Sequence, residues 1–148
     1  QNLEYNNKIY EKGMEIEKVM KANVFTPEVK QEWKRYVLLQ TQFWFNSIEL
    51  KERCDLQYQN VVHLYRLENL PQEEFINNKV QSSVLLELKE RCGNKIMLIP
   101  LTTDLDLVSV ETIVKQYKIE QFPSVIVDEK YVFQGLTSLE ELMKVVNC

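Results

Sequence analysis

Short apolar segments alternate with helical segments over the second half of the chain, and this order limits the folds that the chain can adopt. The apolar runs cover residues 61–67, 96–101, 124–127 and 131–133, and the segments of helical periodicity cover residues 76–92, 107–117 and 137–147. Short apolar runs bounded by turns are typical of buried strands. Helices between the first three strands imply parallel crossovers, and the tight turn at residues 128–130 makes the last two strands an antiparallel hairpin. The order therefore predicts an α/β fold, β-α-β-α-β-β-α, with a mixed sheet flanked by helices.

The helix ends in this half carry local signals of their own. Gly93 follows the segment 76–92 at the position where a left-handed cap favours glycine. The sequence Thr137-Ser138-Leu139-Glu140 has the form of a capping box, in which the first side chain binds a backbone N–H group of the first turn. We therefore expect the last helix to open at this box and to run to about Asn147.

The first 54 residues are predicted to be helical. Residues 1–23 carry apolar side chains at helical spacing. A second helix begins after Thr26, which can cap the free N–H groups, and Pro27 and Glu28 both suit a first turn. We therefore divide the chain into a helical extension, residues 1–25, and a domain, residues 26–148, whose long first helix covers residues 27–54.

Three consecutive aromatic residues lie in this long helix. Phe43, Trp44 and Phe45 fan over roughly 200° because each residue of a helix turns by about 100°. One sheet cannot cover all three rings. The remaining face of the helix is covered by the extension, by a second copy of the chain in a homodimer through residues 1–54, or by another partner. The sequence leaves these alternatives open.

Composition and charge exclude several classes of protein. The 148 residues carry a formal net charge of -4, with lysines and arginines scattered among glutamates. Without a basic stripe, a nucleic-acid partner is not expected. No apolar run approaches the roughly 18 residues that a membrane-spanning helix needs. The chain starts at Gln1 without a methionine, so we expect a processed piece from which a signal or anchor has been removed.

The cysteines are too far apart in the sequence for a Cys-x-x-Cys motif. They are Cys54, Cys92 and Cys148, and this odd number leaves at least one thiol free or intermolecular while allowing one disulfide. With the single histidine, His63, they supply too few ligands for a structural zinc site. We therefore expect no metal site and no cofactor.

The segment that ends the third helix resembles a turn of the thioredoxin-like superfamily. Its sequence is Tyr117-Lys118-Ile119-Glu120-Gln121-Phe122-Pro123-Ser124-Val125-Ile126-Val127. It is similar to that family's helix end, its Tyr-x-Ile-x-x-x-Pro-Thr turn and the strand that follows. Gly135 stands where the family has a glycine before its last helix. The resemblance covers roughly residues 60–148, with the helix 27–54 before them, and it implies a thioredoxin-like fold.

The family's redox chemistry depends on two cysteines at the start of the helix after the first strand of this region, and these are missing here. Alignment from the strand places residues 69–72 there, and alignment back from Gly93 places residues 74–78 there; neither window contains a cysteine. The strand alignment also puts His63 at the family's buried acidic position. Because no disulfide lies above it, we expect His63 to be structural, partly buried and hydrogen-bonded.

The resemblance further implies a cis peptide bond between Phe122 and Pro123. In the family, the residue before this proline pairs through its backbone with a bound peptide. Phe122 and Pro123 are therefore the candidate peptide-binding residues of this chain. The alternative is that Pro123 only stops one helix and directs the next strand.

The cysteines are poorly placed for catalysis. Cys54 and Cys92 end predicted helices, where the helix dipole raises the pKa of a thiol, and Cys148 ends the last predicted helix on the same side of the sheet. These positions suit a disulfide among the three. Paired cysteines are typical of an extracytoplasmic domain, such as one cut from a membrane-anchored protein.

The sequence thus favours a redox-inactive, non-catalytic thioredoxin-like domain used for protein interaction or structural support. One alternative is an enzyme of the same fold that uses a single thiol or glutathione, which would need an exposed cysteine of low pKa. Another alternative is a helical oligomerisation module built from residues 1–54.

Overall fold

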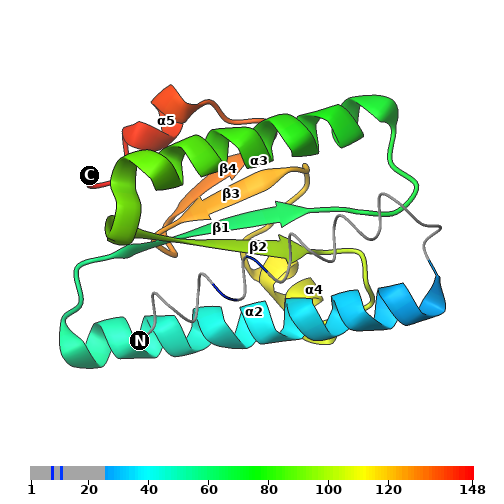
Figure 1. The fold of residues 1–148 in the computed structure, drawn as a ribbon, viewed down its shortest axis with the longest axis horizontal. Coiled ribbons are helices and arrows are strands. Elements are labelled where there is room, and N and C mark those ends of the chain that lie inside the picture. Colours follow the sequence, from blue (N-terminus) through cyan, green and yellow to red (C-terminus); the bar gives the residue numbers. More distant parts are fainter. Residues whose placement is uncertain (1–7, 9–10, 12–25) are drawn as a thin grey trace.

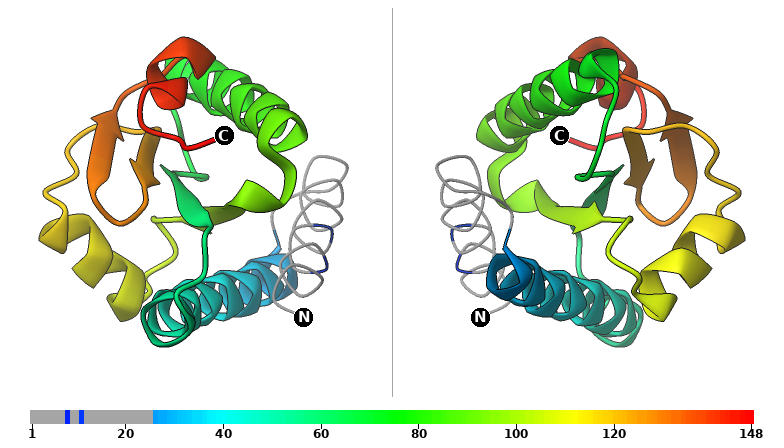
Figure 2. Two further views of the ribbon diagram at one scale, coloured as in Figure 1. Left: turned by 90° about the vertical axis from the view of Figure 1, so that its left-hand side faces the viewer. Right: turned by 90° about the vertical axis from the view of Figure 1, so that its right-hand side faces the viewer.

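In the computed structural model, which describes Lys8, Glu11 and residues 26–148, a four-stranded sheet lies between two layers of helices (Figure 1). Helices α2 (Pro27–Cys54) and α4 (Val108–Gln116) cover one face, and α3 (Gln72–Cys92) and α5 (Leu139–Met143) cover the other, as the end views in Figure 2 show. The helix expected over residues 1–23 and its packing lie outside the described residues, apart from Lys8 and Glu11, which are helical.

The sheet has the strand order β2-β1-β3-β4. Its strands are β1 (Gln59–Tyr65), β2 (Ile96–Thr102), β3 (Ser124–Val127) and β4 (Tyr131–Gln134). Strand β1 pairs in parallel with β2 and antiparallel with β3, and β4 forms a hairpin with β3. The predicted order β-α-β-α-β-β-α and the mixed sheet are therefore confirmed, and the fold is thioredoxin-like.

The expected parallel crossovers between the first three strands are only half right. The crossover from β1 to β2 is parallel, but β3 runs antiparallel to β1. Helix α4 by itself is too short to carry the chain back along β2, because its 9 residues span about 14 Å, whereas the 7 residues of β2 span about 23 Å. Strand β3 begins at the end of the sheet where β1 and β2 finish, so the segment between β2 and β3 starts and ends at the same end of the sheet.

Helix α2 begins and packs largely as its sequence predicts. Thr26 is the cap, and its hydroxyl oxygen accepts a 3.2 Å hydrogen bond from the backbone N–H of Val29. Phe43 and Trp44 are buried, but the side chain of Phe45 is 47% exposed. The domain therefore buries two of the three consecutive rings and leaves the third at the surface. Whether the extension contributes to this packing lies outside the described residues.

Two boundaries near the end of β1 differ from the prediction. Strand β1 covers residues 59–65 instead of 61–67, because the backbone N–H of Leu67 turns away to the carboxylate of Asp104. Helix α3 begins at Gln72 instead of residue 76, and Pro71 stands at its cap with an extended backbone. Glu73 and Glu74 in the first turn favour this early start because they face the positive end of the helix dipole.

The last helix also differs from the prediction. Its cap is Ser138, whose hydroxyl accepts from the N–H of Glu141, and the helix ends at Met143 instead of Asn147. Thr137 is held outside the helix, because Gln81 of α3 binds its backbone N–H and C=O and its hydroxyl donates to the C=O of Gly135. Beyond α5, the backbone of the tail is held by the side chain of Gln59. Tertiary contacts thus replace the continuing helix.

Alternate positions of each strand point to opposite faces, which produces two hydrophobic clusters. Val62, Leu64 and Ile126 face α2 and α4, whereas Val61 and Val125 face α3 and α5. Both faces of the central strands are therefore buried, as their near-continuous apolar sequences predict. Among the helices that the structure describes, none has the length and apolar composition to cross a bilayer.

Candidate functional site

The site lies at the end of the sheet where β1 and β2 finish and α3 begins (Figure 1). The turn that carries Phe122 and Pro123 meets them there because β3 starts at this end and runs antiparallel to β1. The Phe122–Pro123 peptide bond is cis. Phe122 is half-buried and Pro123 is buried. We call this region, formed by residues 66–72, 103–104 and 118–123, the docking edge.

The structure decides which of the two windows considered for a cysteine pair stands at the start of α3. Because α3 begins at Gln72, the window 69–72 stands at the start of the helix, whereas the window 74–78 lies within it. The window 69–72 consists of Asn-Leu-Pro-Gln and offers no thiol. Its backbone enters the helix through Asn69, whose φ of 51° is left-handed, a conformation that asparagine tolerates better than most residues.

Two contacts fix the loop between β1 and α3. The carboxylate of Asp104, in the loop after β2, accepts hydrogen bonds from the backbone N–H groups of Leu67 at 3.0 Å and Glu68 at 2.9 Å. The side chain of Glu68 also forms a 3.1 Å ion pair with Lys30 of α2. These contacts hold the loop against both the neighbouring loop and the first helix.

Arg66 joins this loop to α3 and to the proline turn. Its Nε donates a 2.8 Å hydrogen bond to Glu74 Oε2, and its Nη2 pairs with Glu74 Oε1. The guanidinium carbon lies 5.3 Å from the centre of the Phe122 ring. The hydrogen bond with Glu74 raises the pKa of Arg66, so the group stays charged at every relevant pH. The backbone C=O of Arg66 accepts from the side-chain amide of Asn78.

The pairing of β1 with β3 stops just before the docking edge. Its last pair is Leu64 with Ser124, and continued pairing would bring Arg66 opposite Phe122. The ladder does not continue there, and the C=O of Arg66 accepts instead from the side-chain amide of Asn78. Among hydrogen bonds between described residues, none involves the backbone N–H or C=O of Phe122. An unpaired backbone edge of this kind can receive an extended peptide.

A hollow of about 240 Å³ lies beside Phe122. Val114 and the Phe122 ring supply apolar walls, and charged side chains of both signs stand around them. The residues that line the hollow are Arg66, Thr103, Asp104, Glu111, Val114, Lys115 and Phe122. Its charges nearly cancel, so it suits a neutral side chain better than a strongly charged one.

His63 lies in the middle of β1, below this edge, and its side chain is 3% exposed. Burial lowers its pKa to about 3, so the imidazole is neutral near pH 7. The side chain of His63 is therefore almost completely buried, whereas partial burial was expected. The expected hydrogen bond is not found for Nε2, which has no partner among the residues described. Its ring instead packs 4.8 Å from the ring of Tyr65.

The cysteines lie at the opposite end of the sheet from the docking edge. Cys92, at the end of α3, forms a disulfide with Cys148, whereas Cys54, at the end of α2, is free and exposed. Cys148 follows α5 at a distance of several residues, so it does not end that helix as expected. Within residues 26–148 together with Lys8 and Glu11, no group of three or more potential metal ligands is gathered.

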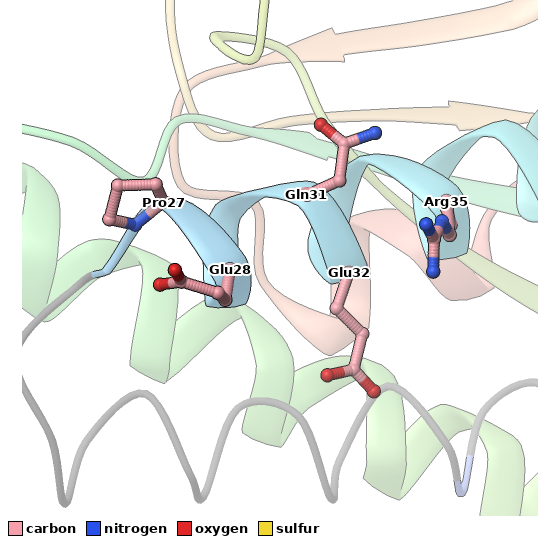
Figure 3. Close-up of a pocket in the computed structure, with 5 residues that line it drawn as sticks. All are labelled: Pro27, Glu28, Gln31, Glu32 and Arg35. Carbon is pink, nitrogen blue, oxygen red and sulfur yellow. The ribbon is translucent and has the colours of Figure 1, made fainter.

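A second, larger hollow of about 480 Å³ lies along the first turns of α2 (Figure 3). Pro27, Glu28, Gln31, Glu32 and Arg35 line it, and Gln31 projects from the side of the helix opposite Glu32. The described residues that line it include no serine, threonine, cysteine or histidine side chain.

Of the residues at the docking edge, Phe122 and Pro123 were predicted from the sequence, whereas Arg66, Glu74 and Asp104 were not. A signal for the missed residues was present in the sequence. Arg66 and Asp104 each follow the end of a parallel strand, and such strand ends meet at one edge of a sheet. The contact between Arg66 and Glu74 does not follow from the sequence, because the predicted helix begins at residue 76 and leaves Glu74 in the loop, whereas α3 starts at Gln72.

The chain thus has a thioredoxin-like fold in which the start of α3 carries no thiol. The chain matches no protein-family model, and no curated protein matches it in sequence. Among solved structures it is similar to the germline-specific thioredoxin Deadhead of Drosophila melanogaster, with 15% identity, a TM-score of 0.49, and coverage of 70% of this chain and 88% of that chain. Mitochondrial thioredoxin 3 of Saccharomyces cerevisiae gives 13% identity, a TM-score of 0.47, and coverage of 67% and 86%. The fold assignment rests on the strand order and connectivity described above.

Proposed function

We propose that this chain is a non-catalytic thioredoxin-like domain that binds an extended peptide segment of another protein at the docking edge. The observation that carries the proposal is the unpaired backbone of Phe122, which lies beside a loop that has no thiol. Peptides that add to such an edge gain affinity from backbone hydrogen bonds and specificity from neighbouring side-chain pockets. The hollow formed by Phe122 and Val114 supports a preference for an apolar side chain in the ligand.

The fixed loop between β1 and α3 also supports a binding role. Asp104, Lys30 and Glu74 hold it through hydrogen bonds and ion pairs to residues 66–68. A pre-organised surface binds with a smaller loss of conformational entropy than a mobile one. Leu136, which is 45% exposed, follows Gly135, and a side chain added to that glycine would lie 3.1 Å from the Gln121 side chain. Leu136 therefore adds apolar surface close to the turn that carries Pro123.

A displayed library of random decapeptides, selected on the immobilised domain, tests this function. We expect selected peptides to contain an apolar residue and to bind the Leu136→Asp and Phe122→Ala variants at least about tenfold more weakly, a loss of about 1.4 kcal/mol. Leu56→Asp is the matched control, because Leu56 is 41% exposed and lies just before β1, at the other end of the sheet. Failure to select any peptide, or equal weakening by the control, would contradict the proposal.

A redox enzyme that uses a single thiol is the weaker alternative. Cys54 is exposed, but it ends α2 and lies at the far end of the sheet from Phe122. Cys92 is bound in the disulfide. The alternative therefore lacks an activated thiol near a place where a substrate could bind.

A helical oligomerisation module is the second alternative, and one observation favours it. Leu38 and Phe45 lie on one face of α2, seven residues apart, and are 46% and 47% exposed. Sedimentation of the wild-type chain and of a Leu38→Lys, Phe45→Lys variant tests it. A dimer that the double substitution converts to a monomer would support this reading, and a wild-type monomer would contradict it.

The disulfide supports an extracytoplasmic location, because such bonds persist in oxidising compartments. It is also compatible with the domain being the extracytoplasmic part of a membrane-anchored protein. The disulfide would hold the end of α3 to the carboxyl-terminal tail, far from the docking edge.

A further inference from the structure

The segment before Phe122 is exposed and gains little support from the helix that precedes it. The N–H groups of Lys118 and Ile119 bind the last carbonyls of α4, but those of Glu120 and Gln121 point away from that helix. Lys118 has a left-handed backbone with a φ of 54°. A turn of this kind needs a further tie if it is to hold one conformation.

The side chain of Gln134 supplies that tie. Its Oε1 accepts hydrogen bonds from the backbone N–H groups of Glu120 at 2.7 Å and Gln121 at 3.1 Å. Its Nε2 donates a 3.2 Å hydrogen bond to the backbone C=O of Lys118. One amide thus bridges both ends of the turn, and it uses an acceptor and a donor at the same time, which neither a glutamate nor a leucine side chain can do.

The place of Gln134 in the sheet explains why its side chain reaches the turn. It is the last residue of β4, and its backbone lies opposite Ser124, the first residue of β3. The hydroxyl of Ser124 also donates to the C=O of Gln121 at 2.5 Å. The hairpin therefore holds the turn from two neighbouring positions and fixes the direction in which Phe122 leaves it.

Glutamine plays the same part at two other places in the chain. Gln81 binds the backbone N–H and C=O of Thr137, and Gln59 binds the N–H of Asn147 and the C=O of Val145. Those two side chains are buried and hold structural segments, whereas Gln134 is exposed and holds the turn of the docking edge. A backbone amide held by Gln81 or Gln59 can therefore serve as the control for the amides that Gln134 holds.

We propose that Gln134 is the positioning residue of the docking edge, which keeps the turn 118–121 in the conformation that leaves the backbone of Phe122 unpaired. The effect of Gln134 on peptide affinity rests on the proposed function. Its hold on the turn 118–121 does not. Loss of the tie leaves the sheet intact because the backbone pairing of β3 with β4 does not involve the side chain of Gln134. It frees the turn and therefore raises the entropy that a bound peptide must remove.

Amide hydrogen exchange followed by NMR tests the structural part. In the Gln134→Leu variant we expect the amides of Glu120 and Gln121 to exchange at least about tenfold faster, while the amide of Thr137, held by Gln81, keeps its rate. Gln134→Glu keeps both acceptor contacts and should preserve most of this protection. Unchanged exchange at both amides of Gln134→Leu, or an equal rise at Thr137, would overturn the proposal.

Binding of the selected decapeptides tests the consequence. We expect Gln134→Leu to weaken binding at least about tenfold and Gln134→Glu to weaken it less, with urea midpoints close to that of the wild type. A freed turn with unchanged peptide affinity would overturn the positioning role. If the wild-type domain selects no peptide, the proposed function fails, and the exchange rates still decide whether Gln134 holds the turn.

Discussion

The indole Nε1 of Trp44 donates a 2.7 Å hydrogen bond to Glu129 Oε2, which joins the middle of α2 to the tip of the β3–β4 hairpin, 85 residues further along the chain. The same carboxylate accepts from the side-chain amide of Asn60 and pairs with Lys51. Burial disfavours the charged form of Lys51, but its hydrogen bond to Asp128 and the charge of Glu129 outweigh this and raise its pKa. The hairpin is thus anchored by a mostly buried polar network.

Removal of this carboxylate should destabilise the domain. In Glu129→Ala, the donors of Trp44 and the fully buried Asn60 lose their acceptor, and each such loss costs about 1–3 kcal/mol. We expect the free energy of unfolding in urea to fall by about 3 kcal/mol, and by less in Glu129→Gln, which keeps an acceptor. The exposed Glu52 is the control, and Glu52→Ala should change stability by no more than about 0.5 kcal/mol. Equal effects of Glu129→Ala and Glu52→Ala would refute the anchor.

The buried His63 should make the domain sensitive to acid. Its folded pKa of about 3 lies below the unfolded value of 6.5, so between these values the unfolded chain binds a proton that the folded chain does not. The contribution of the neutral His63 to the free energy of unfolding is therefore fully present above about pH 7, and it is lost as the pH falls toward 3. From the two pKa values, the loss between pH 7 and pH 5 is about 2 kcal/mol.

Urea unfolding at pH 7 and pH 5 measures this loss. The His63→Leu variant has no such proton and should lose about 2 kcal/mol less than the wild type between the two pH values. Each protein is compared with itself at the two pH values. A change in the free energy of unfolding that the leucine causes through packing is therefore present at both and cancels. Parallel pH profiles of the two proteins would show that His63 does not titrate in this way.

The disulfide between Cys92 and Cys148 should contribute strongly to stability. It closes a segment with a sequence separation of 56 residues, for which the chain-entropy model gives about 4 kcal/mol. We expect Cys148→Ser to unfold at a clearly lower urea concentration, whereas Cys54→Ser should match the wild type, because Cys54 is free and exposed.

Intact mass after alkylation in denaturant checks the pairing itself. Without reductant, one thiol, that of Cys54, should be alkylated, and after reduction all three cysteines should react. Alkylation of all three without reductant would show that the bond is not formed in solution.

The domain should not reduce disulfides. The segment at the start of α3 is Asn-Leu-Pro-Gln, and the exposed thiol lies at the other end of the sheet. With dithiothreitol as the electron donor, insulin reduction should proceed at the rate of the buffer control. A clearly faster rate that Cys54→Ser abolishes would favour the single-thiol enzyme instead.

The order of elements from β1 to α5 follows from the sequence alone, since short apolar runs and helical periodicity are local patterns. It also located the cap at Thr26 and the tight turn before β4, because these depend on residues close together in the chain. The resemblance of residues 117–127 to a known turn pointed to Phe122 and Pro123.

The surroundings of these elements depend on the three-dimensional fold. The direction of β3, the shortened α5 and the place of Arg66 on the Phe122 ring all depend on contacts between segments far apart in the sequence. Gln81 displaces Thr137 from the cap, and Gln134 holds the turn before Phe122, through side-chain amides that substitute for backbone pairing. A local pattern cannot encode such contacts, because an amide side chain has the same propensity whether it faces water or a backbone brought to it by the fold.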